Sequence, residues 1–365
     1  MYTLLIASLL ALFFTYQESI GNCKNGLAWG VVLLTILAAL HYDFGNDYMS
    51  YFNGYKEITN QGFDFDAILD KEVWKEPGWA FLCFAFYPLG GFFSLVIFLS
   101  ILQNMIYYKF IQKYVDKKWL VLALFIYLFS TSYYVLNMSM LRQGLAISLF
   151  VWAFNFIKEK KILPAATLII SAASIHNSAM ILFPFILWGE IPMNQTFSKI
   201  FSVVCGIIFF ALYLNTEYVN LIFAGFMAMD NFQEYAITYE DTAYQATYGI
   251  GFIFKTIPFV MFLFYLLKNK EAERWQRQIV SIACIGTFIV PFAQNVPLIT
   301  RIGLYFEVFT IFAIPIVYKW IPNIRIKIIV INILVMITLY DYYLFFDASV
   351  FAKYYSTYKT IFSAM

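Results

Sequence analysis

The chain has 365 residues, of which 62% are hydrophobic, 21% aromatic and 13% charged, and its formal net charge is +2. Soluble domains are closer to half apolar and a quarter charged, so this composition excludes an ordinary soluble protein. Apolar stretches of roughly 16 to 28 residues recur along the whole length, which suits a bilayer core about 30 Å thick. The sequence therefore predicts an all-α, polytopic membrane protein that forms a single domain over residues 1–365, with no nucleic-acid partner.

The predicted membrane segments follow one another without a soluble domain between them. They cover residues 2–16, 27–41, 80–107, 119–136, 143–157, 162–188, 199–214, 249–267, 279–292, 302–317 and 328–344. No basic region precedes the first segment and no convincing cleavage site follows it, so we interpret it as a membrane helix and not as a signal peptide. The cysteines are scattered and form no Cys-x-x-Cys pair, which indicates neither a zinc site nor a disulfide framework.

Lysine and arginine in the short loops predict the orientation of the chain, because such residues prefer the cytoplasmic side. The basic loops contain Lys109, Lys113, Lys117 and Lys118; Lys158, Lys160 and Lys161; Lys268, Lys270, Arg274 and Arg277; and Lys319, Arg325 and Lys327. The long connections 42–79 and 215–248 are acidic and aromatic. We therefore expect one long and one medium extracytoplasmic loop.

This orientation requires an odd number of crossings between the basic loop at 158–161 and the outer loop at 215–248. The simplest solution splits the segment 162–188 at Ser174–Ser178, with two short arms that meet near the outer face. Each arm of about 13 residues measures about 20 Å, too short for an upright span, and broken helices are tolerated where they line a polar cavity. The alternative is one intact helix and a re-entrant piece at 219–229. With the split, we count about twelve crossings or partial crossings, so the chain has about 11–12 transmembrane segments and both termini are expected outside.

Unusual polar residues gather at the predicted outer ends of these segments. They are Asp43, Asp47, Glu76, Arg142, His176 and Arg301. An ionisable group at the edge of a membrane segment is costly and so suggests function, and we expect these side chains to line one outward-facing cavity. The competing interpretations are arginines that extend to the lipid headgroups, solvated loop carboxylates and a histidine that only completes a helix break.

A possible metal-binding pair, Asp64-Phe65-Asp66, lies in the first outer loop. That loop is rich in acidic residues, so such a pair arises easily by chance. We expect no metal site and no cofactor.

Five segments together carry a family resemblance. They are His41–Tyr51, Trp74–Trp79, Leu141–Ala146, Ile175–Ala179 and Arg301–Phe306. In this order they resemble the motifs of the EpsG family, which is grouped with the Wzy-type polymerases of exopolysaccharides, capsules and O-antigens. The resemblance extends from about residue 40 to about residue 310. It leads us to expect arginine where His41 stands, and a protonated histidine partly replaces that charge.

The resemblance implies a multi-pass protein of the bacterial cytoplasmic (inner) membrane with its active site on the extracytoplasmic side. Its implied substrate is a polyprenyl-pyrophosphate-linked oligosaccharide, which serves as donor and acceptor in a metal-independent, inverting glycosyl transfer. A chain-length regulator and a flippase are implied partners, beside the lipid bilayer.

The residue types agree with this chemistry. Arginine binds phosphate oxygens through two parallel hydrogen bonds, so Arg142 and Arg301 are our candidates for the pyrophosphate. A general base helps the acceptor hydroxyl to attack, and the candidates for that role, or for orienting the sugars, are Asp47, Glu76 and His176. Further substrate-binding candidates are His41, Gln143, Tyr48 and Tyr51, with Trp79 as another ring for sugar stacking.

Three other functions remain open from the sequence. The first is a metal-dependent membrane glycosyltransferase that uses Asp64 and Asp66. The second is a non-enzymatic flippase for lipid-linked glycans, which needs polar groups deep in the bundle, whereas the notable ones here gather outside. The third is an O-acyltransferase that modifies sugars and takes its acyl donor from the cytoplasm.

Overall fold

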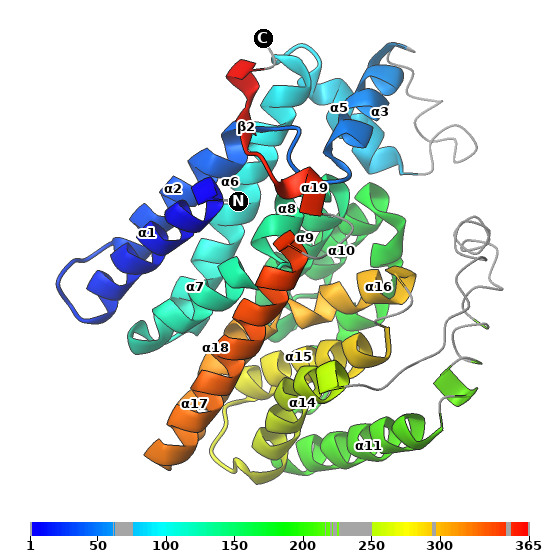
Figure 1. The fold of residues 1–365 in the computed structure, drawn as a ribbon. Helices are drawn as coiled ribbons and strands as arrows, with labels where there is room; N and C mark the ends of the chain where they lie inside the picture. Colours follow the sequence, from blue (N-terminus) through cyan, green and yellow to red (C-terminus); the bar gives the residue numbers. More distant parts are fainter. Residues whose placement is uncertain are drawn as a thin grey trace. The chain divides into compact units, whose positions relative to one another are not determined.

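The computed structural model describes residues 2–60, 62, 76–215, 217–219, 221, 225, 250–293, 297–347 and 352–363. Nearly all of the described secondary structure is helical (Figure 1), which confirms the predicted all-α membrane bundle. The chain divides into two compact units. Unit 1 comprises Met1–Glu190 and Pro322–Met365, and unit 2 comprises Ile191–Ile321.

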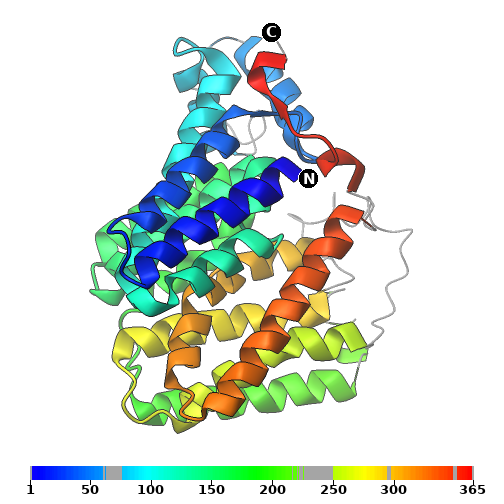
Figure 2. The same ribbon diagram turned by 60° about the vertical axis from the view of Figure 1, so that its left-hand side comes forward.

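Unit 1 begins with two apolar helices, α1 (Tyr2–Ser19) and α2 (Gly26–Leu40), which lie side by side as a hairpin (Figures 1 and 2). The helices that follow are α3 (Tyr48–Asn60), α5 (Pro77–Phe86), α6 (Gly91–Tyr114), α7 (Leu120–Phe129), α8 (Tyr134–Ser139), α9 (Leu141–Lys158), α10 (Ile162–Ile175), α18 (Ile324–Asp347) and α19 (Ala352–Tyr355). The 3₁₀ helices are η1 (Lys117–Trp119), η2 (Asn177–Leu187) and η4 (Ile361–Ser363). The strands β1 (His41–Tyr42) and β2 (Lys359–Thr360) pair antiparallel and join the chain's C-terminal part to the start of the first outer loop.

Unit 2 contains α11 (Gln195–Leu214), α14 (Ile250–Lys268), α15 (Arg274–Ala293), α16 (Pro297–Glu307) and α17 (Thr310–Trp320). In Figure 1, α14 lies beside both α11 and α15. Helices α15 and α16 approach closely at Gly286, where a Cβ would lie only 2.2 Å from the backbone nitrogen of Glu307. The predicted outer loop 215–248 lies almost entirely outside the described residues.

Four described helices are long and apolar enough to cross a bilayer: α6, α11, α18 and the part of α14 from Gly251 to Lys268. Helices α16 and α17 pass the same test as a pair and would make a fifth span, bent by 50°. The apolar helices α2, α5, α10 and η2 are shorter. The total of 11–12 crossings therefore stays a prediction.

The sequence placed several helix boundaries wrongly. The predicted segment 80–107 is two helices, because Pro88 and the positive φ of Gly90 (107°) and Gly91 (77°) interrupt it. Both features are incompatible with a continuous helix. The segment 119–136 ends at Phe129, and the segment 302–317 bends after Glu307. The segment 42–79, predicted as the first outer loop, contains a helix, α3, that the sequence analysis did not identify.

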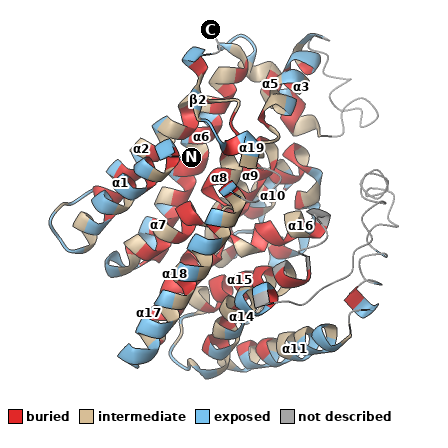
Figure 3. Cartoon of the chain, in the orientation of Figure 1, coloured by how far each residue is buried: buried red, intermediate tan, exposed pale blue. Residues whose placement is uncertain are grey.

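The predicted break in the segment 162–188 is confirmed. Helix α10 ends at Ile175, His176 has an extended backbone (φ −149°, ψ 113°), and η2 begins at Asn177. All residues of α9 are buried or half-buried, and Figure 3 shows that helix in red and tan. One buried apolar cluster joins α3, α5, α6 and α9 through residues such as Tyr48, Trp79 and Phe92, and it supports the site described next.

Candidate active site

Glu76 lies on the turn directly before α5, and Pro77 begins the helix. Proline favours this first helical position because its missing N–H would have no partner there. The next residue, Gly78, lies against the end of α10: a Cβ on it would be 2.3 Å from Ser174 Oγ and 2.9 Å from the Ser174 carbonyl carbon. Glycine at this position therefore lets the start of α5 lie against the helix break at His176.

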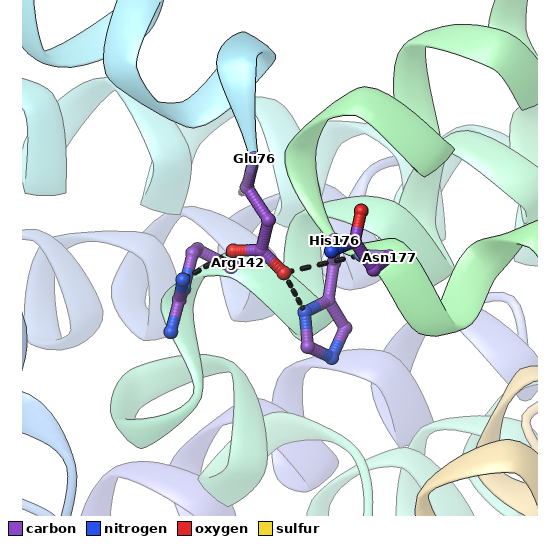
Figure 4. A network of polar contacts seen from close by, with 4 residues as sticks. All are labelled: Glu76, Arg142, His176 and Asn177. Carbon is purple, nitrogen blue, oxygen red and sulfur yellow. Dashed lines mark hydrogen bonds and ion pairs between the residues drawn. The ribbon is translucent and has the colours of Figure 1, made fainter. Parts of the chain in front are cut away.

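The Glu76 carboxylate joins three segments that are far apart in the sequence (Figure 4). Its Oε2 forms an ion pair with Nη1 of Arg142, on the first turn of α9. Its Oε1 accepts a hydrogen bond from the backbone N–H of Asn177 at 3.1 Å and lies 2.8 Å from Nδ1 of His176. The Glu76 and His176 side chains are each 10% exposed and that of Arg142 is 36% exposed, so only the arginine is substantially accessible.

The neighbours of Glu76 determine its charge state. Burial raises the pKa of this carboxyl, but the hydrogen bond to His176, the positive charge of Arg142 and the Asn177 N–H together lower its pKa below the ordinary value. Glu76 is therefore ionised at neutral pH and is a weak base.

An ionised carboxylate beside Nδ1 also sets the proton position on His176. A carboxylate only accepts hydrogen bonds, so we assign the proton of a neutral His176 to Nδ1, which leaves the lone pair on Nε2. That Nε2 is buried and forms no hydrogen bond with any residue that the structure describes.

Arg142 also contacts an aromatic ring, in addition to its ion pair with Glu76. The Arg142 guanidinium lies over the ring of Tyr51, 5.1 Å from its centroid, and Tyr51 contacts Trp79 edge-on at 5.6 Å. Burial raises the pKa of the Tyr51 hydroxyl, and the charges of Arg142, Asp47 and Glu76 all act on it. Asp47 therefore lies within electrostatic range of this group of residues.

The loop that carries Asp47 is held against the end of α8. Gly45 has a φ of 114°, and a Cβ on it would be 2.5 Å from Cβ of Ser139. Ser139 Oγ donates to Asn46 Oδ1 at 3.1 Å, and Asn46 Nδ2 donates to Asp47 Oδ1 at 2.8 Å. The Asp47 carboxylate is thus positioned by its neighbours in the loop.

His41, Tyr48 and Gln143, which we predicted as substrate-binding residues, are buried in the structure. They are 1%, 0% and 0% exposed, respectively. The His41 ring contacts the backbone oxygens of Ala38 and Met138, and the Tyr48 hydroxyl donates to the His41 carbonyl at 3.2 Å. The ring of His41 thereby contacts one carbonyl in the last turn of α2 and one in the last turn of α8, where carbonyls lack partners within their own helix. His41 and Tyr48 thus make contacts inside unit 1, and the role of all three residues in substrate binding stays a prediction.

Arg301 lies on α16 in unit 2 and is half-buried. That Arg301 lines the same cavity as Arg142 stays a prediction. Asp64 and Asp66 lie outside the described residues, and among the described residues no group of three or more histidines, cysteines or carboxylates is arranged to hold a metal.

The sequence analysis missed Asn177, Ser139 and Asn46, whose contacts are short and polar. Each lies within or next to a segment that carries the family resemblance. The only signal in the sequence was this adjacency, since Asn and Ser at helix ends are common for local reasons.

The model of the EpsG family matches residues 4–360, which is nearly the whole chain. The chain belongs to the EpsG family. No curated protein and no solved structure matches it. With its apolar helices, this membership makes it a multi-pass membrane protein of polysaccharide biosynthesis with a polymerase-type function. In this EpsG-family protein, three of the segments with the resemblance meet at Glu76.

Proposed function

We propose that this EpsG-family protein polymerises polyprenyl-pyrophosphate-linked oligosaccharide repeat units by glycosyl transfer at the extracytoplasmic face of the bacterial cytoplasmic membrane. A growing chain passes from its polyprenyl pyrophosphate to a hydroxyl at the non-reducing end of a new lipid-linked unit. The observation that carries the proposal is the Glu76 carboxylate, which holds an accessible arginine on one oxygen and a histidine on the other.

Arg142 is the proposed partner of the pyrophosphate leaving group. Its charge is permanent, and a planar guanidinium binds phosphate oxygens with defined geometry. Glu76 and the Tyr51 ring hold it in place before substrate arrives. A cation fixed in advance stabilises charge that develops on the leaving oxygen without reorganisation during the reaction.

His176 is the proposed general base. With its Nδ1 proton directed at Glu76, Nε2 keeps a lone pair, and this buried atom accepts the proton of the acceptor hydroxyl once the acceptor has entered the site. The division of roles is that of a serine–histidine–aspartate triad. As the hydroxyl oxygen bonds to the anomeric carbon, the bond from that carbon to the phosphate oxygen breaks and the proton moves to Nε2. In this scheme Glu76 is a positioning residue.

The remaining candidates take supporting roles. Asp47 lies within electrostatic range of Tyr51, and a hydrogen bond from Asn46 fixes the position of its carboxylate. We propose that this carboxylate orients a sugar. Arg301 is proposed as a further phosphate ligand. Inversion and metal independence follow the wider polymerase class.

The test is a gel of lipid-linked glycan from cells that lack this protein and carry the wild type, Arg142→Lys or His176→Ala. Lysine keeps the charge of Arg142 but loses its two-pronged geometry, so we expect shorter chains. Loss of a general base slows transfer by about 10²–10⁴-fold, so we expect His176→Ala to leave mainly single repeat units at a normal protein level.

Other outcomes separate the competing functions. A wild-type ladder from the His176→Ala variant would show that His176 is not the general base. Repeat units that accumulate on the cytoplasmic leaflet in the null strain would indicate a flippase. A full-length ladder that lacks only a decoration would indicate a sugar-modifying enzyme, and activity abolished by a chelator would indicate a metal-dependent transferase.

A further inference from the structure

Unit 1 contains a cavity lined by polar and aromatic side chains, and it lies at the opposite end of α9 from Arg142. It measures about 520 Å³ and lies between the last turns of α6 and α9. Its polar and aromatic lining includes Lys109, Gln112, Lys113, Trp152, Asn155 and Glu159. Asn155 follows Arg142 by thirteen residues on the same helix, or about 20 Å at 1.5 Å per residue. The cavity is therefore separate from the active site.

Positive charge is concentrated around this cavity. Lys113 Nζ donates to Asn155 Oδ1 at 2.7 Å, and the hydroxyl of Tyr114 donates to the same oxygen at 2.9 Å. The ammonium groups of Lys113 and Lys158 lie 5.3 and 5.1 Å from the centroid of the Tyr114 ring. Two cations at one ring repel each other, and an anion bound between them would relieve that repulsion.

The carboxylate in the lining, Glu159, acts on Lys113 and Lys158 electrostatically but forms its ion pair with a different lysine. Glu159 pairs with Lys161 at 2.9 Å. Neither Lys109 nor Lys113 forms an ion pair with any carboxylate that the structure describes, and both are exposed. The cavity thus offers lysine ammonium groups and the Gln112 amide to an external anion.

We propose that this cavity binds a phosphate group, supplied by the headgroup of an anionic membrane lipid. Ammonium and amide N–H groups are suitable donors to phosphate oxygens, and the volume falls within the range of small-ligand sites. Basic pockets between membrane helices on the cytoplasmic side bind anionic headgroups, and these lysines belong to the loops whose charge predicts that side. Trp152 suits the headgroup level for the same reason as other interfacial aromatic residues.

The test uses the purified full-length protein in detergent with a zwitterionic lipid and a titration of phosphatidylglycerol. Bound lipid is counted by native mass spectrometry, and the unfolding temperature is measured in parallel. We expect Lys109→Ala with Lys113→Ala to weaken lipid binding roughly thirty-fold, since each ammonium group loses a hydrogen bond to the phosphate that contributes about one kcal/mol.

The matched control is Lys117→Ala with Lys118→Ala, which removes the same charge from η1, outside the lining. We expect it to weaken binding less than about three-fold. Equal weakening in both double variants would overturn the proposal, because it would show a general surface attraction.

Two further measurements test the role of the cavity and the source of the phosphate group. Lys109→Ala alone leaves the contact between Lys113 and Asn155 intact, and it should still weaken binding about five-fold; unchanged binding in this variant would overturn the role of the cavity. Inorganic phosphate is titrated without phosphatidylglycerol. Stabilisation by millimolar phosphate equal to that by the lipid would show that the source is a soluble anion, and would overturn the lipid headgroup as the ligand.

Discussion

At the scale of single residues, the candidate site depends on the two oxygens of Glu76. One contacts Arg142, and the other contacts His176 and the Asn177 N–H. The sequence grouped Glu76 and His176 as alternative bases. The structure distinguishes them: the carboxylate with the lowered pKa is a weak base, whereas the buried Nε2 of the imidazole beside it forms no hydrogen bond with any described residue.

Replacement of this carboxylate should affect both activity and stability. Glu76→Gln keeps the shape but removes the charge that pairs with Arg142, so we expect mainly single repeat units and a destabilisation of about 1–3 kcal/mol at pH 7. The measurements are the glycan ladder and the unfolding temperature in detergent. A wild-type ladder from Glu76→Gln would contradict its positioning role.

The stability difference should also depend on pH. The folded pKa of Glu76 is below its ordinary value of 4.5. Its stabilising contribution is therefore complete above that value and is lost as the pH falls through the lowered pKa. We expect the unfolding temperatures of wild type and Glu76→Gln to converge as the pH is lowered below about 4.5, and a constant difference down to pH 3 would contradict this assignment.

At the scale of helices and loops, close packing brings the site residues together. The start of α5 meets the end of α10 through Gly78, and the loop 41–47 meets α8 through Gly45. The sequence indicated a break at His176 from charge and parity alone. It did not indicate which helix would lie against that break, because a contact between residues one hundred positions apart leaves no local pattern.

A substitution that adds one methyl group at Gly78 tests whether the close contact between α5 and α10 is needed. Gly78→Ala places a Cβ against the Ser174 backbone, so α5 must move and carry Glu76 away from His176. We expect a loss of chain length in the glycan ladder with little loss of protein. The matched control is Gly54→Ala in α3, where a Cβ meets nothing within 4 Å. Equal glycan ladders from both variants would show that polymerisation does not require the close packing of α5 on α10 at Gly78.

The C-terminal residues 352–363 form a strap over the loop that carries Asp47. The backbone N–H of Gly45 donates to the Tyr354 carbonyl at 3.1 Å, and β1 pairs with β2. The Tyr355 hydroxyl lies 3.3 Å from Asn46 Oδ1. These contacts lie next to Asp47, so the strap positions one side of the site.

Removal of the strap should therefore impair polymerisation. We expect a chain truncated after residue 351 to insert into the membrane but to produce short glycans, because the loop 41–47 loses its backbone partners. Phe362→Ser serves as the control, since this side chain is 66% exposed and its change should leave the ladder unaltered. Full-length polymer from the truncated chain would show that the strap has no part in the reaction.

At the scale of the whole molecule, the distribution of charge predicts which ends of the helices face the cytoplasm. Arg142 of the candidate active site lies at one end of α9, and the lysine-lined cavity lies at its other end. If the orientation is correct, the glycan chemistry and the proposed lipid site are on opposite membrane faces.

Labelling can test this orientation. In a variant without the native cysteines, Lys56→Cys in α3 and Lys117→Cys in η1 both place an exposed thiol. An impermeant maleimide applied to intact cells or spheroplasts should label only the cysteine at 56, and inverted membrane vesicles should reverse the result. Labelling of residue 117 from outside would invert the predicted topology and the placement of the active site.

The sequence by itself determined the class of this protein, the break at His176 and the chemical types of its candidate residues. These depend on apolar length, loop charge and local motifs, all of which are properties of neighbouring residues. Only the tertiary structure decided that Glu76 joins Arg142 to His176, and that His41, Tyr48 and Gln143 lie inside. Those outcomes depend on which helices pack together at their small residues, and such long-range contacts arise from the fold as a whole.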